Sequence, residues 1–125
     1  MNKWIYWLPA LAMMGIIFYL SSRTGDELKS AFPFIPDFNP GHLLAYFILG
    51  CLIYYALILS GARHPGLWSV FLCALYGLTD EYHQSFVPGR APELRDMIND
   101  TTGAMLAVVI IALAKKRTRK KAERG

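Results

Sequence analysis

Four continuous apolar runs organise the chain. They extend from Trp4 to Leu20, from His42 to Leu59, from Leu67 to Leu78 and from Thr101 to Ala114, and the first run holds no charged residue. Within each run the apolar residues follow one another instead of alternating with polar ones, which favours helices over the strands of a membrane barrel. The pattern therefore predicts an all-α protein.

The lengths of these runs decide whether the helices can cross a bilayer. A membrane-spanning helix needs about 20 mostly apolar residues, within a range of about 17–25. The first two runs meet this length unaided, whereas the other two meet it only if their helices extend through Asp80–His83 and back through Asp96–Asp100. We predict a four-transmembrane-helix bundle in a single domain over residues 1–125, with helices at about 4–20, 42–60, 67–84 and 96–114.

The first of these helices is expected to be retained in the mature protein. Its 17 residues exceed the roughly 7–15 apolar residues of a signal-peptide core, and no A-x-A-like cleavage site follows.

Composition supports the membrane interpretation. Apolar types make up 54% of the 125 residues, charged types make up 18%, and the mean hydropathy is +0.31. A soluble domain typically contains about 45–50% apolar and about 25% charged residues. A disordered chain would combine low hydrophobicity with high charge. Cys51 and Cys73 lie in apolar runs, so we expect two small hydrophobic residues there and no disulfide scaffold.

Positive charge is concentrated in a basic tail, residues 115–125. The tail holds seven Lys and Arg residues against the single acid Glu123, so it carries +6 while the rest of the chain carries −2. No nucleic-acid recognition motif accompanies this charge, so we expect no nucleic-acid partner. A basic cluster directly after an apolar helix is typical of a cytoplasmic anchor at an anionic leaflet.

The distribution of Lys and Arg also predicts the orientation in the membrane. With four spans, the amino terminus, the loop around Arg63 and the basic tail share one side, which holds nine of these cations against four on the other. The positive-inside rule then places both termini in the cytoplasm. The connection Ser21–Gly41 and the one that contains Pro88 and Gly89 lie outside in this topology.

In this topology the strongly polar residues gather at the outer ends of all four helices. From Leu67 to Asp80 is 13 residues, or about 20 Å of helix, whereas the hydrocarbon layer is about 30 Å thick. Ionisable groups below the headgroups face protein or water and are functional by default. We therefore predict an outward-facing polar cavity, with these candidate ligand-binding residues: Ser21, Ser22, His42, Tyr46, Asp80, Glu81, Gln84, Arg90, Asp96 and Asn99.

A purely structural interpretation is open for each residue. Asp96 and Asn99 are also suitable capping residues for the fourth helix. Asp80 and Glu81 have potential ion-pair partners in Arg90 and Arg95, and such pairs would only tie two helices together.

The same residues carry a family resemblance. The relevant segments are Ser21–Gly25, His42–Tyr46 with Leu49 and Gly50, Asp80–Arg90 and Asp96–Gly103. In this order they resemble the VanZ-like family of small bacterial membrane proteins. The resemblance implies a multi-pass envelope protein of the bacterial inner membrane, and some relatives are linked to resistance to teicoplanin-type lipoglycopeptides. It implies no established catalytic activity.

Three function classes stay open. The first is a module that binds a membrane lipid, a lipid-linked cell-wall precursor or a lipoglycopeptide, in which Arg90 holds phosphate and Tyr46, Gln84 and Asn99 bond hydroxyls. The second is a membrane-embedded enzyme that modifies or hydrolyses a lipid headgroup, with Glu81 or Asp80 as a base. The third is an oligomeric transporter, since four helices are too few for a lone carrier. The oligomeric state itself stays open.

We predict neither a metal nor another cofactor. His42, His83 and a carboxylate are conceivable metal ligands, but no pair of them stands at a recognised ligand spacing. The sequence also contains no HExxH motif and no GxSxG motif, which mark a zinc protease and a serine nucleophile.

Overall fold

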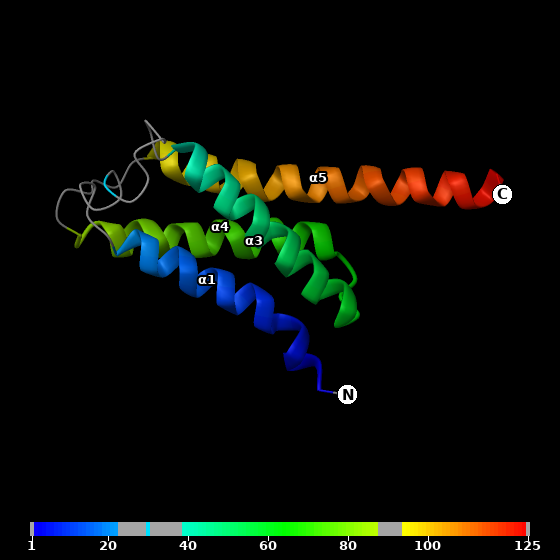
Figure 1. The fold of residues 1–125 in the computed structure, drawn as a ribbon, viewed down its shortest axis with the longest axis horizontal. Helices are drawn as coiled ribbons and strands as arrows, with labels where there is room; N and C mark the ends of the chain where they lie inside the picture. Colours follow the sequence, from blue (N-terminus) through cyan, green and yellow to red (C-terminus); the bar gives the residue numbers. More distant parts are fainter. Residues whose placement is uncertain (1, 23–29, 31–38, 88–93, 125) are drawn as a thin grey trace.

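The computed structural model describes residues 2–22, 30, 39–87 and 94–124, and within the helices it leaves out the side chains of residues 39–42 and 94–96. The described part is helical throughout (Figure 1). A short 3-10 helix, η1 (Lys3–Trp7), leads into α1 (Leu8–Ser21), and three longer helices follow: α3 (Asn39–Leu59), α4 (Pro65–Gln84) and α5 (Leu94–Arg124).

Local sequence signals explain where these elements begin and end. The Asn2 side chain accepts a hydrogen bond from the Trp4 amide, 3.3 Å away, and caps η1. Pro9 stands in the first turn of α1, where its missing amide hydrogen would have no helical partner anyway. At the end of α3, Gly61 has a φ of +82°, and the amides of Gly61 and Ala62 donate to the carbonyls of Ile58 and Leu57. This left-handed glycine cap closes α3 and turns the chain into α4.

The helices run up and down in alternation. As a result, α1 and α4 finish at the end of the bundle where α3 and α5 begin, and the chain termini lie towards the other end (Figure 1). We call the first of these the polar end, because of the side chains described below. α3 has its largest interface with α5 and also contacts α1 and α4, so it is the central helix.

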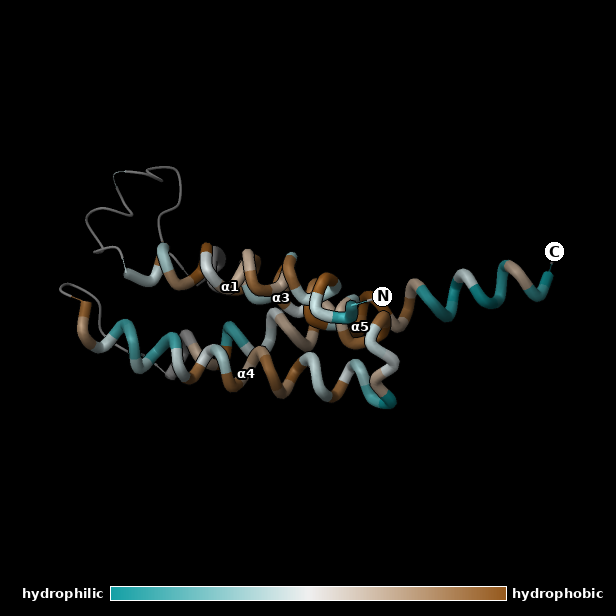
Figure 2. The backbone as a smooth tube through the Cα atoms, turned by 90° about the horizontal axis from the view of Figure 1, so that it is seen from below, coloured by the Kyte–Doolittle hydropathy of each residue, from teal (hydrophilic) through white to brown (hydrophobic). Residues whose placement is uncertain are grey.

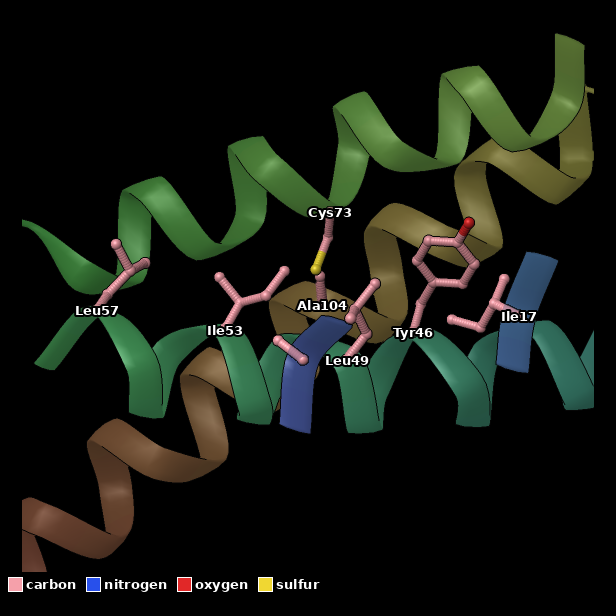
Figure 3. Close-up of a cluster of buried hydrophobic side chains, with 8 residues drawn as sticks. Ile17, Tyr46, Leu49, Ile53, Leu57, Cys73 and Ala104 are labelled. Carbon is pink, nitrogen blue, oxygen red and sulfur yellow. The ribbon is translucent and has the colours of Figure 1, made fainter. Parts of the chain in front are cut away.

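The apolar core follows the inner face of α3. Tyr46, Leu49, Ile53 and Leu57 are buried there at spacings of three and four residues (Figure 3). Cys73 of α4, Ala104 of α5 and Ile17 of α1 complete the cluster from the surrounding helices, and are also buried. Both cysteines are free.

The interface between α3 and α5 is built from small residues. A Cβ on Gly103 would lie 2.5 Å from the Leu43 carbonyl oxygen, and a Cβ on Gly50 would lie 3.1 Å from Ala104 and from Ala107. Glycine and alanine at such contacts let two helix backbones approach closely, as is common between membrane helices.

The distribution of polarity is inverted relative to a soluble protein. Large hydrophobic side chains cover the surface, with Trp4 75% and Leu67 71% exposed, while Asp80, Glu81 and Asp100 are at most 5% exposed. Water-soluble proteins almost never bury carboxylates while leaving so many large apolar side chains outside. An apolar exterior around buried ionisable side chains is the arrangement expected of helices in lipid.

Two of the described helices are long and apolar enough to cross a membrane, Lys3–Ser21 and Met97–Arg124. The described apolar segment of α3, Leu43–Leu59, is shorter. The prediction of an all-α fold is therefore confirmed, and two of its helices are long and apolar enough to span a membrane.

The predicted helix limits need one correction. The fourth helix was expected to end near residue 114, but α5 continues through the basic tail to Arg124 and extends beyond the other helices as a mainly hydrophilic segment (Figure 2). Lys, Arg, Ala and Glu are strong helix formers, and neither Gly nor Pro interrupts the tail before Gly125. With η1 and α1 taken together as the first helix, the other limits differ from the predicted ones by no more than three residues.

Candidate functional site

A stripe of buried side chains follows the inward face of α4 and ends in polar groups at the polar end. Ser69, Cys73, Asp80 and Gln84 are all buried, at successive separations of four, seven and four residues. These separations place them on one stripe of a helix. The same face of α4 therefore packs against the apolar core in the middle of the helix and carries an acid, Asp80, and an amide, Gln84, near the end of the helix.

Tyr46 joins this stripe from the central helix. It is fully buried, its ring points across the core towards α4 (Figure 3), and its hydroxyl donates a long hydrogen bond of 3.5 Å to Asp80 Oδ2. The carboxylates of Asp80 and Asp100 both lie within electrostatic range of Tyr46. The tyrosine therefore connects the apolar core to the acidic groups at the polar end.

Asp100 supplies a second fully buried carboxylate, from α5. A Cβ on Gly77 would lie 3.0 Å from Asp100 Oδ2, so only a residue without a side chain leaves room for this carboxylate against α4. Gly77 stands one helical turn before Asp80 and four residues before Glu81. The contact thus brings acids of α4 and α5 into the same region.

Side-chain hydrogen bonds connect α1 to α4. Gln84 Nε2 donates to Ser21 Oγ over 3.3 Å, and both residues are buried. About two turns along α4 towards the middle of the bundle, the Tyr76 hydroxyl donates to the Met14 carbonyl oxygen over 2.5 Å. These bonds hold the last turns of α1 beside the polar stripe.

His83 makes the third contact with α1. Its ring stacks on Phe18 with 4.3 Å between the ring centroids and 15° between the planes. Its Nε2 lies 3.4 Å from Ser22 Oγ, and Ser22 Oγ in turn donates to the Phe18 carbonyl oxygen over 2.9 Å. The ring is therefore fixed in orientation at the polar end.

Glu81 lies beside an open surface hollow of about 550 Å³ on α4, which is lined by Leu78, Thr79, Glu81, Tyr82 and Ser85. Leu78 and Tyr82 are 52% and 71% exposed, whereas Glu81 is only 5% exposed. Thr79 and Ser85 donate their hydroxyl protons to carbonyls of α4 itself. An open, mostly apolar hollow with one ionisable group among its lining residues thus lies on α4 beside the buried acids.

Six of the ten predicted site residues lie together at the polar end: Ser21, Ser22, Tyr46, Asp80, Glu81 and Gln84. Asn99 is half-buried next to Asp100 on α5. Arg90 and the side chains of His42 and Asp96 lie outside the described residues.

Two further polar residues of the site, Asp100 and His83, were not among the predicted ones. A signal for Asp100 was present, since Gly103, Ala104 and Ala107 follow it at three, four and seven residues and mark the face of a tightly packed helix. For His83 the signal was its position three residues after Asp80, on a neighbouring part of the same face.

A comparison with family models decides the family of the chain. Residues 6–115 match the model described as VanZ/LLP1. The chain belongs to the VanZ/LLP1 family. The predicted VanZ-like resemblance is thus confirmed. No curated protein and no solved structure matches the chain.

The described residues at the polar end of this VanZ/LLP1 protein bring together carboxylates, an amide, hydroxyls and an imidazole. Among the described residues, no three His, Cys, Asp or Glu side chains converge as they would around a metal ion. Ser22 and His83 do not form a nucleophile and base, because the Ser22 proton is directed to the Phe18 carbonyl and a serine nucleophile must present its proton to the imidazole.

Proposed function

We propose that this VanZ/LLP1 protein is an integral membrane protein of the bacterial cell envelope that binds the headgroup of a lipid or of a lipid-linked cell-wall precursor. The binding site is a polar cavity at the polar end of the bundle. The observation that carries the proposal is the burial of Asp80, Glu81, Gln84 and Asp100 inside a bundle with an apolar exterior. Such groups are expensive to hold within a membrane and are typical of functional sites.

The hollow at Glu81 supports a lipid as the ligand. The hollow has a volume of about 550 Å³ and is open towards the outside of the bundle, where an acyl chain could lie. In our proposal an acyl chain lies along Leu78 and Tyr82, and the headgroup reaches Glu81 from the lipid side. Arg90, His42, Asp96 and Asn99 complete the cavity, with Arg90 as the partner of a phosphate.

We further propose four membrane spans with both termini in the cytoplasm. Lys3 Nζ donates to the Ser60 carbonyl oxygen over 3.2 Å, and Lys115 Nζ donates to the Tyr54 hydroxyl over 3.3 Å. The first contact joins η1 to the end of α3, and the second joins the start of the basic tail to α3. Both contacts lie away from the polar end. The positive-inside rule favours the cytoplasm for the end opposite the polar end.

The depth of the acids fits this orientation. Fifteen residues separate Lys115 from Asp100 along the continuous helix α5, which corresponds to about 22 Å. If Lys115 marks the inner boundary of a hydrocarbon layer about 30 Å thick, Asp100 lies in its outer half. The polar cavity then opens towards the outer surface.

Cysteine labelling tests the orientation. After Cys51 and Cys73 are replaced by alanine, Ser85→Cys at the polar end should react with a membrane-impermeant maleimide in intact cells. Thr118→Cys in the basic tail should react only after the membrane is permeabilised. The reverse pattern would contradict the orientation.

Lipid retention tests the function. The protein purified in mild detergent should carry specific lipids that mass spectrometry identifies, and Glu81→Gln should reduce their amount while the protein still inserts and folds. Glu123→Gln, the same change on the exposed tail, is the matched control. Equal lipid content in the two variants would overturn the proposal.

A physiological consequence concerns antibiotics. If the bound molecule is a cell-wall precursor or its lipid carrier, production of this protein in a susceptible bacterium should alter the inhibitory concentration of teicoplanin. The Glu81→Gln variant, produced to the same level, should lose that effect.

A further inference from the structure

His83 has one ring nitrogen that the packing of α1 and α4 leaves unused. The ring is half-buried, and its stacking on Phe18 fixes its plane. Nε2 faces Ser22, whereas Nδ1 is buried and has no hydrogen-bond partner within the part of the chain that the structure describes. A buried polar atom without a partner is unfavourable, and in native proteins it usually has a water, an ion or a ligand as its partner.

The Ser22 hydroxyl reveals which nitrogen carries the proton. A hydroxyl has one proton to donate, and that of Ser22 goes to the Phe18 carbonyl oxygen, which can only accept, over 2.9 Å. Ser22 Oγ must therefore act as an acceptor towards His83 Nε2, 3.4 Å away. It follows that Nε2 bears a hydrogen, so that in the tautomer with a single ring hydrogen Nδ1 presents a lone pair.

This lone pair lies in the polar end. His83 comes three residues after the buried Asp80 and directly before the buried Gln84. On α1, Ser21 bonds to Gln84 while Ser22 bonds to His83, so the same turn of α1 orients both side chains. A ligand bound in the proposed cavity at the polar end would have this nitrogen, fixed in orientation, available as a hydrogen-bond partner.

We propose that His83 is a ligand-binding residue whose Nδ1 accepts a hydrogen bond from a hydroxyl or an ammonium group of the headgroup. This inference rests on the proposed function, because it assigns a further contact in the same cavity. It also specifies the ligand class: the headgroup must carry a hydrogen-bond donor, such as the ammonium of an ethanolamine lipid or the hydroxyls of a glycerol or sugar lipid. A choline headgroup, which has no N–H and no O–H, cannot make this contact.

Lipid titration followed by native mass spectrometry tests the proposal. The full-length protein is titrated with phosphatidylethanolamine, phosphatidylglycerol and phosphatidylcholine of identical acyl chains. The wild type should prefer at least one of the first two over the third, and which one it prefers distinguishes ammonium from hydroxyl. His83→Gln should weaken that preference by about two- to tenfold, the range expected for one hydrogen bond. His64→Gln, the same change on an exposed residue of the α3–α4 link, should leave it unchanged.

The outcomes separate the two proposals. If Glu81→Gln loses the preference and His83→Gln keeps it, the role of His83 is wrong and the proposed function stands. If neither variant changes the binding of any of the three lipids, both proposals fail. If the partner of Nδ1 is a water molecule and not the lipid, His83→Gln should keep the preference while Glu81→Gln loses it.

A second measurement does not depend on a folded variant. In the wild type labelled with ¹⁵N-histidine, His83 should show the tautomer with hydrogen on Nε2, and the Nδ1 resonance should shift when the preferred lipid is added but not when phosphatidylcholine is added. A hydrogen on Nδ1, or equal spectra with both lipids, would overturn the proposal.

Discussion

Two helix interfaces of this bundle are built in opposite ways. Between α3 and α5 the backbones meet through Gly50, Gly103, Ala104 and Ala107, with hardly any side chain in between. Between α1 and α4 the contact runs through polar side chains: Tyr76 reaches the Met14 carbonyl, His83 reaches Ser22, and Gln84 reaches Ser21.

This difference suggests a division of roles, in which the α3–α5 contact is the scaffold and the polar groups of α4 belong to the proposed ligand site. Small residues let membrane helices pack closely against one another, and Gly50, Gly103, Ala104 and Ala107 provide such a contact between α3 and α5. The polar residues on α4 exceed what packing requires, since interhelical hydrogen bonds add only modestly to stability in a membrane. We therefore expect α3–α5 variants to change stability and α1–α4 variants to change binding.

The largest effect is expected for Gly103→Ala. The new Cβ would lie 2.5 Å from the Leu43 carbonyl oxygen, and because this neighbour is backbone, α3 and α5 would have to move apart. Overpacking of this kind costs typically about 1–3 kcal/mol, and we expect the upper end of that range in thermal unfolding in detergent.

Gly15→Ala is the control for that variant, because no atom lies within 4 Å of the Cβ position at Gly15. Alanine is the better helix former, so this change should leave the melting temperature unchanged or raise it. Equal losses in both variants would show that the α3–α5 interface is not the scaffold.

A smaller effect is expected for Tyr76→Phe. The change removes the hydroxyl that donates to the Met14 carbonyl, and one hydrogen bond contributes about 0.5–1.5 kcal/mol to stability. Tyr82→Phe removes a hydroxyl from a ring that is 71% exposed and serves as the control, with no expected loss. If Tyr76→Phe lowers the stability as much as Gly103→Ala does, the α1–α4 contact is a structural interface like that between α3 and α5.

The smallest effect on stability is expected for the double variant Ser21→Ala/Gln84→Met. Replacing both partners of a buried hydrogen bond by apolar groups is often nearly neutral, so the melting temperature should stay close to that of the wild type. Lipid retention should nevertheless fall, because the amide and the hydroxyl at the polar end are lost. Normal retention in a stable double variant would remove this pair from the site.

The sequence predicts those parts of this architecture that depend on neighbours along the chain. Continuous apolar runs predict the helices, and the spacing of four residues between Asp80 and Gln84 predicts their common face, which the structure confirms. The helical basic tail was not predicted, because the limit near residue 114 follows the end of the apolar run and takes no account of the helix propensity of the tail residues.

Contacts between distant segments could not be predicted in the same way. The burial of Asp100 depends on the missing side chain of Gly77 on another helix. The orientation of His83 depends on Phe18 and Ser22, more than 60 residues away in the chain. A single sequence with helical spacing alone contains no information on which helix faces which.

The central claim is that Glu81 and Arg90 belong to a ligand site and do not form an ion pair that merely ties the fold together. The measurement is a comparison of Glu81→Gln, Arg90→Met and the double variant, each by melting temperature and by lipid retention. Breaking a buried structural pair costs roughly 3–5 kcal/mol, and removing the second charge restores much of it. We predict instead that Glu81→Gln melts like the wild type but retains less lipid, and that the double variant stays deficient. A destabilised Glu81→Gln variant whose stability and lipid retention both recover in the double variant would contradict the account.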